Sequence, residues 1–585
     1  MKKTKLVALG LAASLVVGMV GCGDTKTDAD TSTTSSESKS TESISTESAS
    51  ADNTATEEPM HIVIGAMTNS GVADWKDNLL TKEVEERFNV DLEFFMLPSA
   101  NGDWVTKVSL MGTAQADTMP DMLFGDGVVP SSQQVELGAA GVFTAIEDYV
   151  YDAEKMPYFN AIPEEMRQEM LEIAMLQPDG HIYGLADYSN TPSNNNPERM
   201  WINQTWLDAL ELEKPTTTEE LKEVLIAFRD NDPNGNGVQD EIGIYGRRQG
   251  WGEDTIPCLM GSFVAWNNGK QNGGLTVDQE TGETVVAPFV SEDWKEGIIY
   301  MNDLYNEGVL SAAIFTDDDT TYKGTINLDP PIVAVVDMAG KGWITEEQIR
   351  DQYDFLLPVE GPKGLSFFPT RSPSFYAEVV FTCTGEKLER CLAIEDAMYD
   401  FSTPESLGFV KQGWGEYGVD WTDDPEVCAK ANSLYLEVGL IDEIKYVRLN
   451  PPANPQNWNW AGFGAGVPVD YKIFNEVATM YNGEIYDIEA AGDEWQLDYL
   501  AALDDPKYVP KTLPPLTWTT EESDSLGDTR SNIISYVNSF LAECVTGVQD
   551  VNKNWDGYIK EIESLGLQNW LDMAQMIYDR QRGAN

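Results

Sequence analysis

The segment from residue 230 to residue 241 carries side chains whose types and spacing suit a metal ion. It reads Asp-Asn-Asp-Pro-Asn-Gly-Asn-Gly-Val-Gln-Asp-Glu, in which Asp232, Asn234 and Asn236 alternate before a closing Asp240-Glu241 pair. Calcium takes six to eight hard oxygen ligands from a compact, flexible loop, and a closing carboxylate can bind it with both oxygens. A backbone carbonyl near Val238 would add one more oxygen. The segment therefore predicts a calcium loop.

The spacing leaves the first ligand open. If Asp232 comes first, the run departs from the twelve-residue EF-hand pattern, whereas Asp230 as the first ligand puts Glu241 at the twelfth place. The alternative to calcium is a solvated acidic turn at the end of a helix. The ordered alternation of oxygen-bearing side chains favours the ion.

A second group of residues has the chemistry to bind a sugar. Aromatic rings stack on the apolar C–H faces of a sugar, while Asn, Asp, Arg and backbone groups satisfy its hydroxyls. The chain has 16 Trp and 23 Tyr, and several of these rings stand among Gly and polar residues that suit loops. The alternative for each ring is a place in a core, and for the arginine a surface ion pair. The candidate ligand contacts are Trp251, Trp266, Trp414, Tyr417, Trp458, Trp460 and Arg371.

Nothing in the chain matches a familiar catalytic motif. The two histidines are His61 and His181, and GxSxG, HExxH, a P-loop and CxxC are all missing from the sequence. A glycosidase needs only two carboxylates, and 98 acidic residues make suitable pairs inevitable. We therefore expect no enzymatic activity. Two alternatives stay open, a lipid-anchored carbohydrate-active enzyme and a surface adhesin or sensor that takes no part in transport.

The charge balance excludes some partners. Lys and Arg number 38 against 98 Asp and Glu, which gives a formal net charge of −60. Such a polyanion repels nucleic acid and anionic headgroups, whereas it tolerates divalent cations. With 585 residues, of which 42% are hydrophobic, the chain is long enough for two or more lobes.

The first residues predict export and lipid attachment. Lys2, Lys3 and Lys5 precede an apolar run over residues 6–20, which is too short to span a bilayer comfortably. The run ends in Met-Val-Gly-Cys at Cys22, which resembles a bacterial lipoprotein signal. We expect residues 1–21 to be removed, Cys22 to carry lipid, and residues 22–59, rich in Ser, Thr and Glu, to form a disordered tether. The alternative is an ordinary signal peptide with an incidental cysteine.

The remaining cysteines are Cys258, Cys383, Cys391, Cys428 and Cys544. Five thiols without a CxxC do not make a disulfide framework. We expect them to be buried small apolar residues, and this leaves open one chance disulfide between two of them.

The folded part predicts alternating strands and helices. Strand patterns at 61–67 and 90–97 flank a helical pattern on Leu80, Val84 and Phe88, which indicates a parallel βαβ unit. Further strands are expected at 121–124, 200–203 and 332–336. Thr217 and Glu220 fit the capping box of a helix that leads into the calcium loop, and the C-terminal third is mostly helical. The expected class is α/β.

Several stretches together resemble a known family. They are Trp-Ile-Asn-Gln-Thr-Trp-Leu at 201–207, the helix start at 215–221, the calcium loop, Gln-Pro-Asp-Gly-His-Ile-Tyr-Gly at 177–184, Gly-Trp-Gly-Glu-Tyr-Gly-Val-Asp-Trp at 413–421, and the terminal segment 555–580. Over nearly all of residues 60–585 the chain is similar to extracellular solute-binding protein family 1. The similarity is greatest to large lipoproteins of oligosaccharide transporters, among them alginate-oligosaccharide binders with a calcium loop.

The resemblance implies a two-lobe fold of the type II periplasmic-binding-protein kind. Lobe one is placed at 60–195 and 330–378, and lobe two, mostly helical, at 196–329 and 379–585. An oligosaccharide or similar polar solute would bind in the cleft, and hinge closure would present it to an ABC permease at the outer face of the bacterial membrane. In this family the calcium is structural, and its implied ligands here are Asp232, Asn234, Asn236, the Val238 carbonyl, Asp240 and Glu241.

Overall fold

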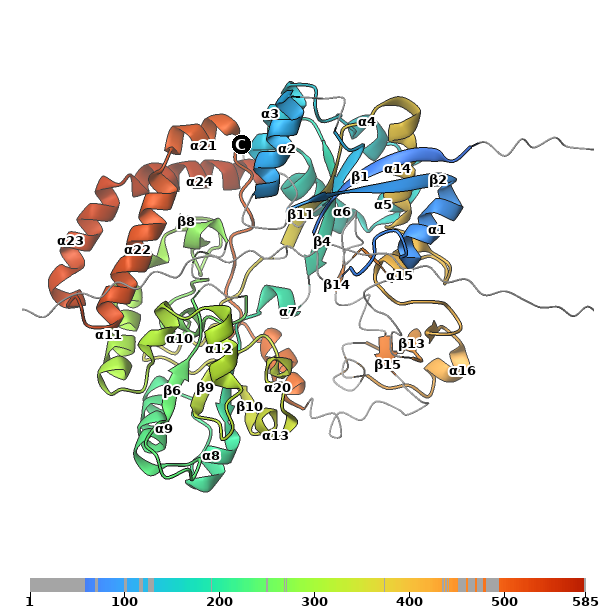
Figure 1. Ribbon diagram of the computed structural model, residues 1–585. Coiled ribbons are helices and arrows are strands. Elements are labelled where there is room, and N and C mark those ends of the chain that lie inside the picture. Colours follow the sequence, from blue (N-terminus) through green and yellow to red (C-terminus); the bar gives the residue numbers. More distant parts are fainter. Residues whose placement is uncertain are drawn as a thin grey trace, which may run out of the picture. The chain divides into compact units, whose positions relative to one another are not determined.

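The first lobe is built on a mixed sheet whose strand order is β14-β4-β11-β3-β1-β2 (Figure 1). The strands among the described residues are β1 (Met60–Met67), β2 (Val90–Leu97), β3 (Met122–Phe124), β4 (Gly184–Asn190), β11 (Ser374–Phe381) and β14 (Val469–Asp470).

The predicted βαβ unit is confirmed. Strands β1 and β2 pair in parallel from Met60 opposite Val90 to Met67 opposite Leu97. Helix α1 (Leu79–Phe88) connects them. It begins where the Asn78 side chain accepts a hydrogen bond from the Leu80 amide, and it ends at Asn89 in the left-handed conformation. Leu80 and Val84 are buried on the face of α1 that packs in the core of this lobe.

Short helices surround the first sheet. Their apolar side chains share one core with β1, β3 and β11, which includes Phe143, Phe159 and Met398. The helices are α2 (Asp103–Ala114), α3 (Ser131–Ala139), α4 (Glu147–Val150), α5 (Pro157–Ala161), α6 (Glu164–Met170) with a π-helical turn at Leu171–Met175, α14 (Gly385–Ala397) and α15 (Leu407–Lys411).

The second lobe is built on a smaller sheet in the order β10-β5-β9-β6. Its strands are β5 (Met200–Asn203), β6 (Ile242–Tyr245), β9 (Val333–Asp337) and β10 (Tyr353–Leu356). Strand β6 is parallel to β9, and β5 is antiparallel to both β9 and β10. All five residues of β9 are buried, as expected of a central strand.

Helices cover this second sheet, and several of them pack on one another as a helical bundle. Helix α9 begins with the predicted capping box, in which Thr217 and Glu220 bond each other's backbone amides. The C-terminal α22, α23 and α24 pack on one another and on α11 (Figure 1). The helices are α7 (Pro192–Asn195), α8 (Gln204–Ala209), α9 (Thr218–Asn231), α10 (Thr255–Met260), α11 (Glu292–Asn306), α12 (Asp319–Ile326), α13 (Glu347–Arg350), α20 (Trp495–Leu503), α21 (Thr520–Leu526), α22 (Thr529–Val545), α23 (Val551–Ser564) and α24 (Leu567–Gln581).

Smaller elements complete the fold. A two-stranded sheet pairs β7 (Thr276–Val277) with β8 (Val285–Val286). Strands β12 (Trp421–Thr422), β13 (Tyr446–Arg448) and β15 (Val477–Thr479) form a third sheet next to α16 (Pro425–Cys428). Short 3-10 turns lie at Asn272–Gly274, Pro288–Val290, Ala312–Phe315 and Lys341–Trp343.

The protein is described here from a computed structural model. Residues 58–585 form one compact unit, and none of the helices described in it is long and apolar enough to cross a membrane. The described residues are 58–68, 72–98, 103–114, 119–124, 131–190, 192–248, 251–267, 269, 271–372, 374–433, 436, 439, 441–450, 459–460, 469–470, 477–479 and 494–582.

The strand pairing corrects the expected division into lobes. Residues 330–378 were placed in lobe one, but β9 and β10 pair with β5 in the second sheet, and only β11 joins the first. Residues after 378 were placed in lobe two, yet α14 packs in the first core through Leu388 and Leu392. The chain therefore crosses between lobes after β10, which sequence periodicity cannot reveal because buried strands of both sheets read alike.

Candidate functional site

Charged residues gather at one edge of the second sheet. Strands β6 and β9 are parallel, so their carboxyl ends share that edge, and the antiparallel β5 begins there. Asp337 ends β9, Glu198 and Arg199 immediately precede β5, and the loop to Asp254 follows β6. The carboxyl edge of parallel strands is where α/β proteins bind ligands.

Arg199 contacts several other groups at this edge. It is buried, its amide donates to Asp337 Oδ1 at 2.9 Å, and its Nε donates to the Asn196 carbonyl at 3.0 Å. Its guanidinium also donates to the carbonyl of Ala339 and lies 4.5 Å from the ring centroid of Tyr499. Burial raises the pKa of the Asp337 carboxyl well above its usual value, and the nearby Glu198 adds to that rise. These contacts hold the polar side chains at this edge of the sheet in fixed positions.

Two segments that connect the lobes meet beside this edge. The amide of Arg371 donates to the carbonyl of Asn195 at 2.8 Å, and its guanidinium pairs with the buried Glu198. The Thr370 hydroxyl donates to Asn196 Oδ1 at 2.7 Å. The segment before β5 and the segment before β11 are therefore bonded side by side.

A third segment joins them. The Ser372 hydroxyl donates to Thr512 Oγ1 at 2.8 Å, and the Phe368 amide donates to the carbonyl of Tyr508 at 2.8 Å. Hydrogen bonds thus link three segments next to Arg199: the segment before β5, the segment before β11 and the segment after α20.

Trp251 is the exposed aromatic residue of this edge. It follows β6 and leaves 49% of its surface exposed. The neighbouring Gly252 has a φ of +65°, and a Cβ there would lie 2.6 Å from the Ala339 Cβ and 2.7 Å from the Pro197 carbonyl oxygen. Only glycine allows this close approach, which holds the backbone of the loop that carries Trp251 against the segments that carry Pro197 and Ala339.

The other predicted ligand contacts lie in different surroundings. Trp266 is buried in the second core, with its ring centroid 6.0 Å from that of Trp294. Trp460 is fully buried in the first core, and its Nε1 donates to Thr81 Oγ1 at 2.9 Å. Trp414 is buried against Phe409. These three indoles therefore serve hydrophobic cores in this structure.

The remaining predicted contacts differ again. Tyr417 is 40% exposed, and its hydroxyl donates to Asp423 Oδ1 at 2.5 Å. Arg371 is engaged by Glu198, so it holds the connecting segments together. Trp458 lies outside the described residues. Sugar contact by Trp251 and Tyr417 stays a prediction.

The charged residues of the edge were missed from sequence. Glu198-Arg199 directly precedes a buried strand, and Asp337 directly ends one. The available signal in the sequence was a charged residue directly before or at the end of an apolar strand. Only the pairing of β5 with β9 shows that these charged residues lie together. The described edge belongs to the second lobe, since residues 69–71, 99–102, 125–130 and 191, which follow β1 to β4, lie outside the described residues.

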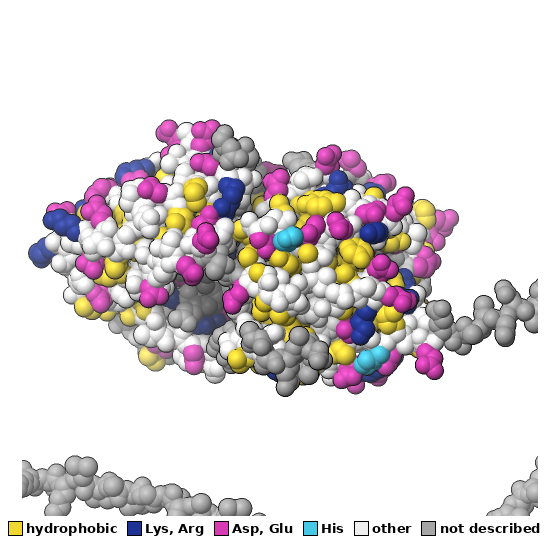
Figure 2. Space-filling model, turned by 90° about the horizontal axis from the view of Figure 1, so that it is seen from above, with side chains coloured by type: hydrophobic (Ala, Val, Ile, Leu, Met, Phe, Trp, Pro, Cys, Tyr) yellow, Lys and Arg dark blue, Asp and Glu magenta, His cyan; other side chains and the backbone are white. Residues whose placement is uncertain are grey.

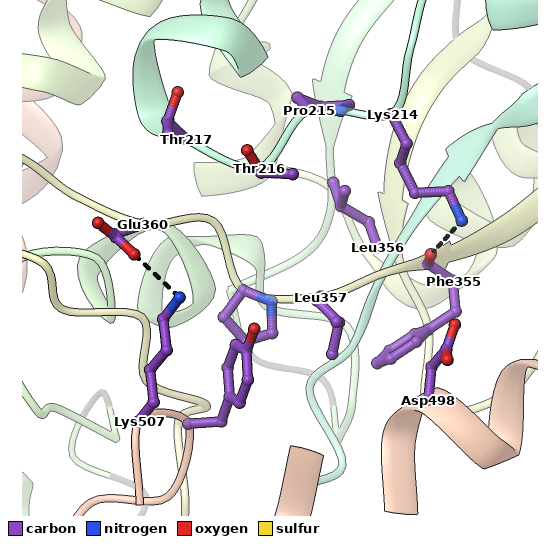
Figure 3. A pocket seen from close by; sticks show the side chains of 12 residues that line it. Lys214, Pro215, Thr216, Thr217, Phe355, Leu356, Leu357, Glu360, Asp498 and Lys507 are labelled. Atoms are coloured by element: carbon purple, nitrogen blue, oxygen red, sulfur yellow. Dashed lines mark hydrogen bonds and ion pairs between the residues drawn. The ribbon is translucent and has the colours of Figure 1, made fainter. Parts of the chain in front are cut away.

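Two pockets lie elsewhere. One, of about 340 Å³, is lined by the segment before α9, the end of β10 and the chain after α20 (Figure 3). Its cationic groups are already paired, Lys507 with Glu360 at 2.9 Å and Lys214 with Asp354 at 2.6 Å. The other, of about 370 Å³, lies beside a hydrogen bond of 3.2 Å from the Thr517 hydroxyl to the Ile173 carbonyl. Neither contains a predicted ligand contact.

The predicted calcium loop connects α9 to β6. Asp232 adopts the left-handed conformation with a φ of +46°, and its Oδ2 accepts from the Gly237 amide at 3.0 Å. Asn236 Oδ1 accepts from the Val238 amide at 2.6 Å, and Asn236 Nδ2 donates to Asp240 Oδ1 at 3.0 Å. Asn234 Nδ2 donates to the Pro331 carbonyl at 3.2 Å, which ties the loop to the start of β9. The loop folds back on itself as a ligand shell requires.

Unsatisfied oxygens in this loop fit a cation. Both carboxylate oxygens of Glu241 and Oδ1 of Asp232 are buried without a hydrogen-bond partner. Burial raises the pKa of Glu241, and the negative charges of Asp240 and Asp232 add to that rise. Buried oxygens of this kind are costly unless a donor or ion meets them. Among the described residues no cluster of three or more His, Cys, Asp or Glu is preformed for a metal, and the predicted set includes two asparagines and a carbonyl.

The surface is strongly acidic. Asp and Glu side chains are spread across the face shown in Figure 2, with Lys and Arg scattered among them. Many cations are paired with acids, such as Lys222 with Asp303 and Lys363 with Asp293 and Glu296.

Comparison with known proteins adds the following. No family model matches the chain. It is 26% identical over 525 residues to the fructooligosaccharide ABC transporter substrate-binding protein FusA of Streptococcus pneumoniae serotype 4, covering 87% of this chain and 88% of that protein. It is also 26% identical over 230 residues to the polygalacturonan/rhamnogalacturonan-binding protein YtcQ of Bacillus subtilis, covering 39% and 41%.

Solved structures share the fold. FusA of S. pneumoniae in complex with kestose superposes with a TM-score of 0.67 at 22% identity, covering 90% of this chain and 100% of that one. The alginate-binding protein AlgQ2 without calcium ion gives a TM-score of 0.57 at 18% identity, covering 90% and 99%. The expected two-lobe fold of a solute-binding protein is thus confirmed.

Proposed function

We propose that this chain, a member of the oligosaccharide-binding extracellular solute-binding proteins, captures an oligosaccharide outside the cytoplasm and delivers it to an ABC permease. Its relatives are transporter-associated or polysaccharide-binding proteins by name, and the match to FusA extends over most of both chains. The ligand named for FusA is a fructooligosaccharide, and that class is the first to test here.

The observation that supports this site is the position of Trp251. The indole is 49% exposed on the loop after β6, and the adjoining Gly252 backbone packs against Pro197 and Ala339, whose carbonyl accepts a hydrogen bond from Arg199. An exposed indole next to fixed polar groups is suited to stack on a sugar face while hydroxyls find hydrogen-bond partners.

Closure would follow from the arrangement of the connecting segments. They are bonded to one another through Arg371, Thr370 and Ser372, so bending is confined to short stretches on either side. A ligand that contacts both lobes binds the closed form better and shifts the population toward it. A permease that favours the closed form would then distinguish loaded from empty protein.

Calcium is proposed as a structural ion of the loop between α9 and β6. Glu241 and Asp232 supply buried oxygens that lack partners, and the neighbouring side chains complete the set. One solved relative is described as an EF-hand mutant of FusA, which indicates that a calcium-type loop was a target of study there. The proposed ligands are Asp232, Asn234, Asn236, the Val238 carbonyl, Asp240 and Glu241.

The proposed location is the outer face of the bacterial membrane, with lipid on Cys22. Cys22 and the tether up to residue 59 precede the strand β1, so the anchor would hold the lobes close to the permease. A lipid and a flexible tether keep the local concentration of the protein near its partner high.

We propose no enzymatic activity. His181 Nδ1 is hydrogen-bonded to Glu147 Oε1 at 2.8 Å, and His61 on β1 lies beside Asp91 and Glu93 of β2. The relatives are named for binding. A carbohydrate-active enzyme stays the alternative, and it predicts product from a bound oligosaccharide.

The decisive experiment is calorimetric titration of the protein with kestose, nystose, a human milk oligosaccharide, an N-glycan and an oligogalacturonate. We expect saturable binding of one class, with the sugar recovered intact by chromatography after overnight incubation. Binding of none, or recovery of shorter products, would overturn the proposal. The oligogalacturonate in the panel separates acidic from neutral ligands.

A further inference from the structure

Two thiols meet where β11 leads into α14. Cys383 lies two residues after the end of β11, and Cys391 lies within α14. Their sulfur atoms are 3.8 Å apart, although the residues are eight positions apart in the chain. A disulfide requires a sulfur–sulfur distance of about 2.05 Å. The remaining approach is therefore less than 2 Å, within reach of side-chain rotation and small backbone adjustment.

The surroundings hold both residues in place. The Cys383 amide donates to the Asp121 carbonyl at 3.3 Å, and its own carbonyl accepts from the Thr144 hydroxyl at 2.9 Å. Helix α14 is anchored through Leu388 and Leu392 in the first core. The meeting of the two sulfurs is thus fixed by the fold on both sides.

The other described cysteines have different neighbours. The Cys258 thiol donates to Asp337 Oδ2 at 3.5 Å, and the Cys428 thiol donates to the Lys445 carbonyl at 3.3 Å. Cys544 is buried in α22. Among the cysteines that the structure describes, only Cys383 and Cys391 are recorded in sulfur–sulfur contact.

We propose that Cys383 and Cys391 are a modification site, where a disulfide oxidant outside the cytoplasm forms a reversible intramolecular disulfide. The Cys383 thiolate attacks one sulfur of the oxidant and forms a mixed disulfide, and the first oxidant thiol leaves. The Cys391 thiolate then attacks the Cys383 sulfur and expels the second. Two protein thiols become one disulfide, one oxidant disulfide becomes two thiols, and the two protons pass to the released thiols.

The exposure of the two residues sets the order of attack. Cys383 is partly exposed, whereas Cys391 is fully buried. A small oxidant can therefore reach Cys383 first. The hydrogen bond to Cys383 and burial both raise the pKa of Cys391, so the second step is expected to accelerate as the pH rises.

The bond would join the end of the central strand β11 to the helix that follows. The segment that carries Arg371 enters β11 at its amino end, whereas the bond would lie at its carboxyl end, so oxidation would stiffen the connection from β11 to α14 within the first lobe. The proposal requires export of the chain, but it is independent of any ligand, and its failure would leave the sugar-binding proposal untouched.

The test is peptide mapping of the full chain after incubation with oxidised glutathione at pH 8. Free thiols are alkylated under denaturing conditions, and the digest is analysed by mass spectrometry with and without reductant. We expect a Cys383–Cys391 cross-link, two mass units lighter than the sum of the reduced peptides, that disappears on reduction. Mapping is needed to distinguish this cross-link from glutathione adducts on Cys258, Cys428 or Cys544.

Variants separate the two steps. Cys391→Ser should stop at a glutathione adduct on Cys383, and Cys383→Ser should leave Cys391 unmodified. Cys544→Ser, a substitution in the other lobe, should form the cross-link as the unmodified protein does. The proposal is overturned if the unmodified protein carries glutathione on Cys383 alone, or if both thiols stay reduced.

Discussion

The guanidinium of Arg371 pairs with the carboxylate of Glu198 between two of the segments that connect the lobes. Glu198 is 1% exposed, and only 16% of the Arg371 side chain is exposed. The two residues are distant in sequence, since one precedes β5 and the other precedes β11. The pair fixes the relative position of these two segments beside the proposed ligand site.

Loss of this pair should destabilise the protein. Removing one partner of a buried ion pair leaves the other charge uncompensated, at a cost of about 3 kcal/mol. We expect Arg371→Ala to lower the midpoint of urea unfolding and to weaken sugar binding, because the connecting segments lose their bond. Circular dichroism and calorimetry measure the two effects. Lys363→Ala, which breaks an exposed pair with Asp293, is the control and should change little.

Trp251 should contribute to affinity and not to stability. Its indole is half exposed, so Trp251→Ala removes little core packing. Loss of one stacking ring costs about 1–2 kcal/mol, which corresponds to a 5- to 30-fold weaker affinity for the oligosaccharide. Titration calorimetry and thermal unfolding report both quantities. Tyr151→Ala, another exposed aromatic in the first lobe, is the matched control, and equal affinity in both variants would remove Trp251 from the site.

The proposed calcium loop predicts that the effect of Glu241→Gln on thermal stability changes sign when calcium is added. Without calcium, Glu241 keeps a buried charge with no partner, so Glu241→Gln should raise the thermal stability in the presence of a chelator. With calcium, the unmodified protein gains about 2.7 kcal/mol at a hundredfold excess over Kd, and the variant gains less. Differential scanning calorimetry with chelator and with calcium gives the comparison. A variant that ranks below the unmodified protein in both solutions would show that the loop needs the carboxylate for another reason.

Asp396 predicts a pH dependence in the first lobe. Burial raises the pKa of this carboxyl to about 6, while its oxygens accept from the amides of Phe159 and Tyr158. The folded pKa lies above the unfolded value near 4, so the folded state binds more protons in between. The contribution to stability is complete below about pH 4 and is lost as the pH rises through 6, by up to about 3 kcal/mol.

The measurement is the free energy of unfolding from pH 4 to pH 7.5. Asp396→Asn cannot titrate, so its stability should fall less over this range than that of the unmodified protein. Asp152→Asn, at a carboxylate whose side chain is 40% exposed in the same lobe, should keep the full dependence. Parallel curves for all three proteins would refute the assignment.

Local pattern was enough to predict much of this fold. The βαβ unit of β1, α1 and β2 and the capping box at Thr217 follow from periodicity and cap chemistry, which act over a few residues. The proposed calcium loop could be predicted for the same reason, since its proposed ligands all lie between residues 232 and 241. Its buried, unpartnered oxygens could be identified only in the structure.

Contacts between residues far apart in the chain could not be predicted from the sequence. Arg371 was taken as a ligand contact because nothing in its local surroundings shows Glu198 beside it. The same limit explains why three tryptophans, Trp266, Trp414 and Trp460, were proposed for the site although their indoles are buried. Glycine-rich flanks suggested loops, but a loop can return its aromatic residue to a core, and burial is decided by packing that no local pattern encodes.

Membrane attachment through Cys22 makes the last prediction. Cys22 follows a small residue at the end of the apolar N-terminal run, so Cys22→Ala should block lipid transfer. Acyl chains on this residue would hold the protein at the membrane, because each buried methylene contributes about 0.8 kcal/mol. In the host cell the unmodified protein should sediment with membranes, while the variant should stay in the soluble fraction or the medium with an unchanged thermal unfolding curve. Gly23→Ala, which keeps the cysteine, is the matched control and should remain membrane-bound. Equal membrane association of the Cys22 variant, after a high-salt wash that removes electrostatic contacts, would place the anchor elsewhere.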